Sequence, residues 1–191
     1  MMPSPKVLAF AGSTRTDSYN KKLVKIAAAG ASAAGAEVTF IDLRDYPLPL
    51  FDEDLEKQGL PANARLLKDL FLANHALLLS CPEYNSSISA VLKNVIDWVS
   101  RPAPNERPLQ CFDGKVAGLM SASPGAFGGM RGLVHVRSIL GNIKVLVVPD
   151  QVAVNKAFEA FNADGSLKDA KQQASAEGLG KTVCTTASKL M

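Results

Sequence analysis

Hydroxyl-bearing and cationic side chains gather in one stretch near the start of the chain, from Gly12 to Asn20. The apolar run Val7–Ala11 ends at Gly12, and a helical segment begins near Asn20. A strand, a glycine turn and a helix N-terminus form an anion site, because free backbone N–H groups and the positive end of the helix dipole meet there. Arg15 adds a positive charge, and the other side-chain donors are Ser13, Thr14, Thr16, Ser18 and Asn20. We predict that this stretch binds one phosphate group.

The spacing of glycines and lysines in the stretch limits the kind of phosphate. A nucleoside-triphosphate loop needs a second glycine followed by Lys and Ser or Thr, and a dinucleotide fingerprint needs two further glycines after Gly12. Neither is present. Many neutral donors and one Arg suit a terminal phosphomonoester, which favours a mononucleotide cofactor. The alternative interpretation is a plain Ser/Thr-rich turn with Ser18 as a helix N-cap.

The composition is that of a soluble globular protein of one domain, residues 1–191, with 47% hydrophobic and 20% charged residues. The net charge of +3 is dispersed, without the basic runs of nucleic-acid binders. No apolar run has the length of a membrane span, and no hydrophobic signal region begins the sequence. We therefore expect a cytoplasmic protein without nucleic-acid or membrane partners. The three cysteines form no CxxC pair, so no metal site is predicted.

Apolar runs alternate with segments of helical periodicity along the whole chain. The predicted strands are Lys6–Ala11, Glu37–Ile41, His75–Ser80, Lys115–Ser121 and Lys144–Val148. The predicted helices are Lys21–Ala34, Ala62–Ala73, Ser87–Ser100, Met130–Leu140 and Leu167–Leu190, the last interrupted by Gly178 and Gly180. This alternation predicts a three-layer α/β domain, and five strands with one phosphate loop suit the flavodoxin-like parallel order 2-1-3-4-5.

The segment Ser87–Ser100 is apolar on more than one helical face. One face would meet the sheet and the other could meet a partner subunit, with Trp98 in the core or the interface. Two long connections, Asp42–Pro61 and Arg101–Gly114, contain several prolines and have no assigned role.

Three polar loops follow the first, third and fourth predicted strands: Gly12–Asn20, Pro82–Ser86 and Ser121–Gly129. In the order 2-1-3-4-5 these loops are neighbours at the switch point, where ligands bind beyond the carboxyl ends of the strands. We predict that a flat ring lies against Pro82–Asn85, with its other polar edge facing the third loop. A turn that merely caps the following helix is the alternative for Pro82–Asn85.

Several motifs resemble the NAD(P)H-dependent FMN reductases. Gly12-Ser13-x-Arg15-x-x-Ser18-x-Asn20 is similar to that family's phosphate loop. Pro82-Glu83-Tyr84-Asn85 and Leu92-Lys93-Asn94-x-Ile96-Asp97-Trp98-x-Ser100-Arg101-Pro102 are similar to its second signature, and Gly128-Gly129-x-Arg131 to its third segment. The similarity runs from about Lys6 to Phe161, and among the family it is strongest to the bacterial quinone, chromate and azo-dye reductases.

The resemblance implies a flavodoxin-like enzyme with non-covalent FMN, NADPH or NADH as co-substrate, and a homodimer or homotetramer. The predicted cofactor-binding residues are Ser13, Arg15, Ser18, Tyr19, Asn20, Pro82, Glu83, Tyr84, Asn85, Ala122 and Ser123. The sequence departs from the commoner pattern at Ser86, often Gly, at Ser89-Ala90, often Pro-Gly, and at Gly132, usually polar. These departures bear on the shape of the ring pocket and on substrate preference.

If FMN is bound, the cofactor carries the chemistry and no side chain need be catalytic. We expect backbone N–H groups near Ser123–Gly125, or a helix N-terminus, to stabilise the negative charge of the reduced flavin. The acceptor would be a quinone, azo compound, metal ion or flavin. Two other functions remain open: a flavodoxin-like electron carrier, although such carriers are usually strongly acidic, and a nucleotide-binding module without flavin.

Overall fold

Five parallel strands form the central sheet of the computed structural model, which describes residues 4–191. They are β1 (Lys6–Ala11), β2 (Glu37–Phe40), β3 (Ala76–Ser80), β6 (Val116–Ala122) and β7 (Leu146–Val154). Their order in the sheet is β2-β1-β3-β6-β7, and every neighbouring pair is parallel. Counted along the chain this is the order 2-1-3-4-5, so the predicted flavodoxin-like fold is confirmed.

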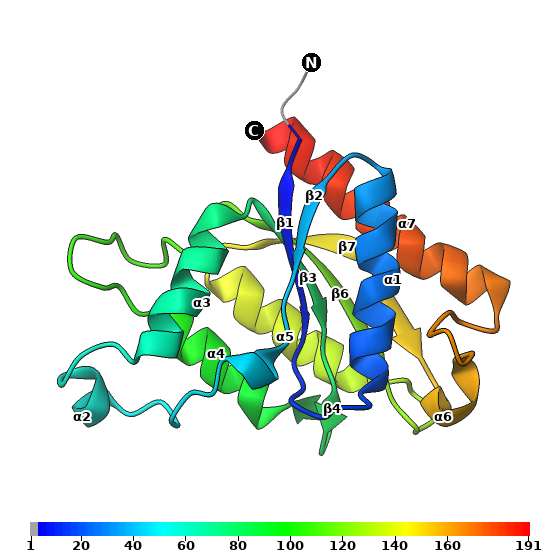
Figure 1. The fold of residues 1–191 in the computed structure, drawn as a ribbon, viewed down its shortest axis with the longest axis horizontal. Helices are drawn as coiled ribbons and strands as arrows, with labels where there is room; N and C mark the ends of the chain where they lie inside the picture. The colour runs from blue at the N-terminus through cyan, green and yellow to red at the C-terminus, as the bar shows by residue number, and fades with distance from the viewer. Residues whose placement is uncertain (1–3) are drawn as a thin grey trace.

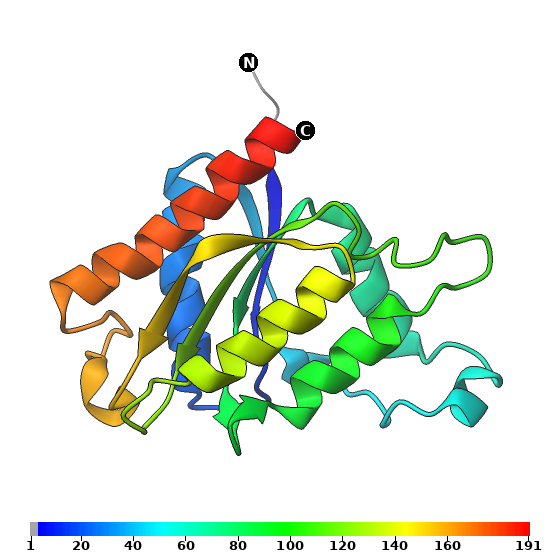
Figure 2. The ribbon, with the colours of Figure 1, turned by 180° about the vertical axis from the view of Figure 1, so that it is seen from behind.

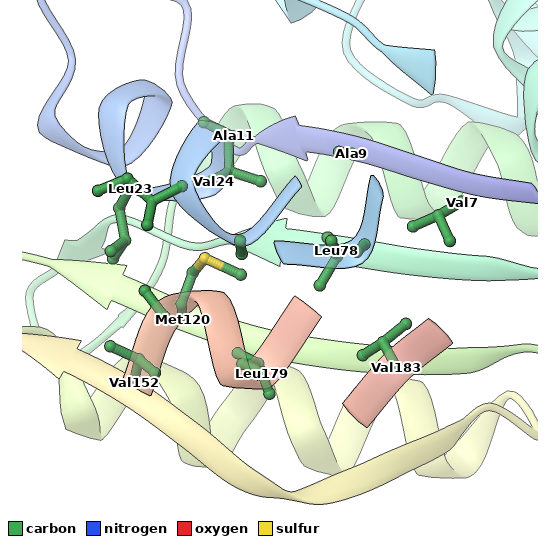
Figure 3. Close-up of a cluster of buried hydrophobic side chains, with 14 of the residues drawn as sticks. Val7, Ala9, Ala11, Leu23, Val24, Leu78, Met120, Val152, Leu179 and Val183 are labelled. Atoms are coloured by element: carbon green, nitrogen blue, oxygen red, sulfur yellow. The ribbon is translucent and has the colours of Figure 1, made fainter. Parts of the chain in front are cut away.

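Helices cover both faces of this sheet (Figures 1 and 2). On one face lie α1 (Tyr19–Ala33) and α7 (Ala170–Leu190), and on the other α3 (Ala62–Ala73), α4 (Ala90–Ser100) and α5 (Met130–Asn142). Strands β1, β3 and β6 are almost wholly buried because they carry apolar side chains on both faces. Figure 3 shows the core on the first face, where Leu23 and Val24 of α1 and Leu179 and Val183 of α7 meet the sheet.

Shorter elements lie in the connections: η1 (Leu43–Asp45), α2 (Glu53–Glu56), β4 (Glu83–Tyr84), β5 (Ser87–Ile88) and α6 (Ala157–Ala160). The helix predicted from Ser87 begins instead at Ala90, because residues 87–88 pair with residues 83–84 in a hairpin and Ser89 is the N-cap. Strand β7 runs beyond the predicted end at Val148 to Val154, after a register shift opposite Ala117–Leu119.

Helix α7 is continuous, so the predicted interruption at Gly178 and Gly180 is wrong. Gly180 serves a close crossing with α1 instead, since a Cβ there would lie 1.9 Å from the carbonyl oxygen of Ala27. Gly30 of α1 faces α7 in the same way, and its added Cβ would lie 2.1 Å from the Glu177 carbonyl oxygen. The crossing requires two glycines, and the helix tolerates their low propensity because tertiary packing stabilises it.

The outer face of α4 contacts another part of the same chain, and the partner subunit expected on this face stays a prediction. The indole N–H of Trp98 donates to the Pro49 carbonyl at 2.9 Å, and the Phe51 ring meets the indole edge-on at 5.0 Å. The Asn94 amide donates to the same carbonyl and accepts from the Phe51 N–H. Part of the connection 42–61 therefore packs over α4, and Trp98 is a core residue.

No helix within residues 4–191 is long and apolar enough to cross a membrane.

Candidate functional site

A pocket of about 160 Å³ opens where the carboxyl ends of β1, β3 and β6 meet. Its walls come from the loop after β1, the start of α1, the β4–β5 hairpin and the loop after β6. The lining residues are Ser13, Arg15, Ser18, Tyr19, Asn20, Pro82, Glu83, Tyr84, Ala122, Ser123 and Pro124. Every residue proposed from the sequence lies in this wall except Asn85, which sits at the tip of the hairpin and is exposed. Pro124 is the one lining residue that the sequence prediction missed.

The loop 12–20 presents donors that the protein does not use. Ser13 and Ser18 are buried, and Ser18 occupies the N-cap position of α1 without making a side-chain cap hydrogen bond. No hydrogen bond within residues 4–191 occupies the backbone N–H groups of Thr14, Thr16 or Ser18. Arg15 is exposed at the rim of the pocket. Free N–H groups at a helix N-terminus beside a guanidinium are suited to an anion.

Asn20 ties three elements together beneath the pocket. Its Oδ1 accepts from the Ser80 hydroxyl at 2.8 Å and from the Ala122 N–H at 3.0 Å, while its Nδ2 donates to the Ala122 carbonyl at 2.8 Å. The side-chain amide thus makes three hydrogen bonds to β3 and β6, which use all but one of its N–H hydrogens. Asn20 fixes the start of α1 against the strand ends, more than it offers donors to a ligand.

The second wall is the β4–β5 hairpin, whose two-residue turn is Asn85-Ser86. Both residues have positive φ, 50° and 65°, as a type I′ turn requires. Asn is common in this conformation and Ser is not. The turn carries Tyr84 to the pocket mouth, where the side chain is 55% exposed.

Glu83 connects the hairpin to helix α5. Its carboxylate accepts from Nε and Nη2 of Arg131 at 3.0 and 2.8 Å, and from the Gly132 N–H at 3.0 Å. Burial favours the neutral acid, but the hydrogen bonds from Gly132 and Arg131 outweigh it and lower the pKa of Glu83. The carboxylate is therefore ionised and occupied, so Glu83 faces the pocket as a wall residue and not as a free acid or base.

The third wall, the loop after β6, does not offer the N–H groups expected of Ser123–Gly125. The Ser123 N–H donates to the Val154 carbonyl at 3.0 Å, Pro124 has none, and the Gly125 N–H donates to the Ser123 hydroxyl at 3.2 Å. That part of the expectation is wrong, because the long strand β7 reaches far enough to take the Ser123 donor. Gly128 and Gly129 follow with φ of 60° and 88°, and a side chain at Gly129 would collide with Ser121.

Two buried hydroxyls that support the site were missed by sequence reasoning. Ser80 binds Asn20, and Ser89 donates to the Gly12 carbonyl at 2.6 Å. The signal for Ser80 was a polar residue ending an otherwise apolar strand. The signal for Ser89 was a hydroxyl at a helix start, which predicts a cap but not its second bond.

A larger hollow of about 430 Å³ lies at the opposite, amino end of the sheet, beside the end of α7. Burial lowers the pKa of Lys115 there to about 8, and its amine donates to the Asn74 carbonyl. In the part of the chain that the structure describes, no loop from the carboxyl ends of the strands lines this hollow, so it contains none of the donors described above. In residues 4–191 no group of three or more His, Cys, Asp and Glu side chains is arranged to hold a metal ion.

Comparison with known proteins finds relatives that match most of the chain. The sequence model of a family described as NADPH-dependent FMN reductase matches residues 5–159. An NAD(P)H-dependent FMN reductase of Pseudomonas aeruginosa is 38% identical over 167 residues, 87% of this chain and 86% of that protein. An NADPH:quinone oxidoreductase of Arabidopsis thaliana is 34% identical over 173 residues, 87% of this chain and 84% of that protein.

Among solved structures, FerB of Paracoccus denitrificans, a flavoenzyme NAD(P)H:(acceptor) oxidoreductase, superposes with a TM-score of 0.81. The two are 29% identical, and the match covers 97% of this chain and 98% of FerB. The matched region includes all three loops that form the pocket. This chain belongs to the NADPH-dependent FMN reductase family.

Proposed function

We propose that this chain is an FMN-dependent NAD(P)H oxidoreductase. It uses a hydride from NAD(P)H for the two-electron reduction of a small acceptor, such as a quinone, an azo compound, a metal ion or a flavin. The observation that carries the proposal is the pocket at the switch point, where unused donors of a helix N-terminus face a hairpin with an exposed aromatic ring. We assign this activity to a single domain of residues 1–191, of which residues 1–3 lie outside the described part.

The donor set fits the phosphate of FMN. Ser13, Ser18 and the free N–H groups of the loop would surround the phosphate oxygens, and Arg15 would neutralise their charge from the rim. Among residues 4–191, Glu83 is the acidic side chain that lines the pocket, and its carboxylate is already bonded to Arg131 and Gly132, so a dianion meets no free carboxylate from this part of the chain. Asn20 would act beneath the phosphate by holding α1 in place.

The remaining walls would hold the ring. Pro82 and Tyr84 would contact one side of the ring, and Ala122, Ser123 and Pro124, which line the same pocket, would contact its other side. Bound FMN supplies the redox chemistry, and the protein binds and orients it. We assign no catalytic side chain, and Asn85 is proposed as a contact only at the outer edge, since it lies at the hairpin tip.

We also propose that the protein is a homodimer or homotetramer, and that a second copy covers an apolar surface beside the pocket. Tyr84, Phe127, Met130 and Val134 are 55, 62, 48 and 60% exposed, and α5 contacts the hairpin that bears Tyr84. Neighbouring exposed apolar side chains of this size favour a protein partner. Light scattering of the wild type and of Val134→Glu tests this: a smaller particle for the variant supports the interface, and a monomeric wild type contradicts it.

The three free, buried cysteines are consistent with the cytoplasmic location that we propose.

The visible spectrum of the purified protein, before and after anaerobic addition of NADPH, tests the proposed activity. We expect the purified protein to be yellow, or to become yellow when FMN is added. NADPH should bleach this yellow colour, and a quinone should restore it. A yellow protein that neither NADPH nor NADH bleaches would indicate an electron carrier. A protein that does not bind added FMN would indicate a nucleotide-binding module without flavin.

A further inference from the structure

Both backbone groups of Gly12, the first residue of the phosphate loop, are held by other elements. Its N–H donates to the Ser80 carbonyl of β3 at 2.8 Å, and its carbonyl accepts from the Ser89 hydroxyl at 2.6 Å. Leu92 of α4 packs against its Cα, so closely that a Cβ at Gly12 would lie 2.9 Å from the Leu92 Cβ. The start of the loop is therefore fixed from the side of α4.

The bond from Ser89 sets the orientation of the next N–H group. The peptide between Gly12 and Ser13 is trans, and in a trans peptide the carbonyl and the N–H point in opposite directions. Because Ser89 holds the Gly12 carbonyl toward α4, the Ser13 N–H is directed away from α4. Ser13 lines the pocket, and no hydrogen bond within residues 4–191 occupies its N–H.

Ser89 is placed to link the two ends of the site. It is 4% exposed and directly follows β5 of the hairpin, and its Oγ also accepts from the Leu92 N–H at 3.3 Å as the N-cap of α4. A capping hydroxyl needs only to accept; here its proton is used for Gly12. One buried hydroxyl thus joins the hairpin and α4 to the phosphate loop.

We infer that Ser89 is a positioning residue for the cofactor phosphate. Its hydroxyl holds the Gly12–Ser13 peptide in the orientation that directs the Ser13 N–H to the phosphate before the cofactor arrives. Without it the loop must be ordered during binding, and such ordering lowers affinity. The inference rests on the proposed function, because it requires FMN as the ligand of this pocket.

The test compares FMN with riboflavin, which has the same ring but no phosphate. Apoproteins of the wild type, Ser89→Ala, Ser89→Gly and Ser89→Thr are titrated with each flavin, followed by quenching of flavin fluorescence. Glycine is a tolerated N-cap, so Ser89→Gly removes the hydroxyl while changing the stability of α4 little. Ser100→Ala is the matched control, since that hydroxyl binds the Asp97 carbonyl at the far end of the same helix.

We expect Ser89→Ala and Ser89→Gly to raise the Kd for FMN about tenfold, as for loss of one buried hydrogen bond. The Kd for riboflavin should stay at the wild-type value, Ser89→Thr should restore FMN binding, and Ser100→Ala should change neither. Equal weakening of both flavins would show a merely structural role and overturn the inference. Unchanged FMN affinity in both variants would overturn it too, whereas a wild type that binds no FMN would overturn the proposed function itself.

Discussion

The Glu83 carboxylate of the β4–β5 hairpin accepts hydrogen bonds from both Nε and Nη2 of Arg131, the second residue of α5, at 3.0 and 2.8 Å. The Glu83 side chain is 8% exposed, and its other oxygen accepts from the Gly132 N–H. A carboxylate near the N-terminus of a helix is further favoured by the helix dipole. The pair therefore holds the second wall of the pocket against the helix that follows the third wall.

Replacing Glu83 with Gln should destabilise the protein by about 1–3 kcal/mol at neutral pH, because three charge-assisted bonds lose their acceptor charge. The pKa of Glu83 is lowered on folding, so its contribution is present at neutral pH and is lost as the pH falls below the unfolded value. Urea unfolding of Glu83→Gln, Arg131→Met and the double variant measures the coupling. Glu37→Gln, at an exposed pair, is the control; a coupling near zero would contradict the clamp.

Arg15→Ala should weaken FMN binding by about 1.5–3 kcal/mol, or roughly 10- to 150-fold, as for loss of a hydrogen bond to a charged group. Riboflavin binding should not change, because Arg15 belongs to the loop that we propose binds the phosphate. Retention of FMN after dilution and gel filtration measures the effect. Lys25→Ala, which removes an exposed cation of α1 outside the pocket, is the control. Full retention in Arg15→Ala would exclude the proposed role.

The sheet order and the meeting of three loops could be predicted because each depends on local patterns. The strands β1 and β3 are continuous apolar runs, and the rules for crossover connections leave few arrangements of such strands. Once Gly12–Asn20 and Pro82–Ser86 follow neighbouring strands, their approach is required by topology. This is why almost all of the pocket wall could be named from the sequence.

Features that depend on contacts between distant residues could not be predicted in this way. The hydroxyl of Ser89 reaches Gly12 across 77 positions, and Asn20 reaches Ala122 across 102. The apolar outer face of α4 predicts that another segment packs against it. The periodicity does not show whether that segment is Pro49 and Phe51 of the same chain or a second subunit. Likewise, Gly178 and Gly180 look alike in the sequence, although only Gly180 touches another helix.

Ser86→Gly should stabilise the protein by roughly 0.5–1 kcal/mol. Ser86 has a φ of 65°. A residue with a Cβ pays about 1–2 kcal/mol in that conformation, which the greater unfolded-state entropy of Gly offsets only in part. The midpoint of urea unfolding should rise with an unchanged slope. Ser87→Gly, at the strand position beside it, should instead destabilise, because it weakens the strand and also removes the hydroxyl that bonds His135 Nδ1 at 2.9 Å. A fall in stability for Ser86→Gly would mean that the hydroxyl makes a contact outweighing the strain.

Glu106 should support stability mainly above pH 4. Burial disfavours its charge, but hydrogen bonds from Lys68 and Arg65 outweigh this and hold its pKa at about 2. The unfolded pKa is higher, so the contribution is full above that value and is lost as the pH falls toward the folded pKa. Glu106→Gln leaves the buried amine of Lys68 with the Val99 and Arg101 carbonyls but without a carboxylate, and should cost about 3 kcal/mol at pH 7.

The difference in unfolding free energy between the wild type and Glu106→Gln should therefore shrink as the pH falls from about 5 to 2, by about 1.4 kcal/mol per pH unit at most. Glu159→Gln, which alters an exposed carboxylate, should show no such trend. A difference that stays constant over this range would contradict the lowered pKa of Glu106.

Gly178 and Gly180 of α7 allow a test of the helix crossing within a single turn. A Cβ at Gly178 would meet nothing within 4 Å, so Gly178→Ala should stabilise by about 0.5–1 kcal/mol through helix propensity alone. A Cβ at Gly180 would lie 1.9 Å from the Ala27 carbonyl oxygen, and backbone cannot move aside as a side chain does. Gly180→Ala should thus destabilise by about 1–3 kcal/mol, as overpacking does. Thermal unfolding of both variants measures the contrast, and equal effects would mean that α1 and α7 do not cross at Gly180.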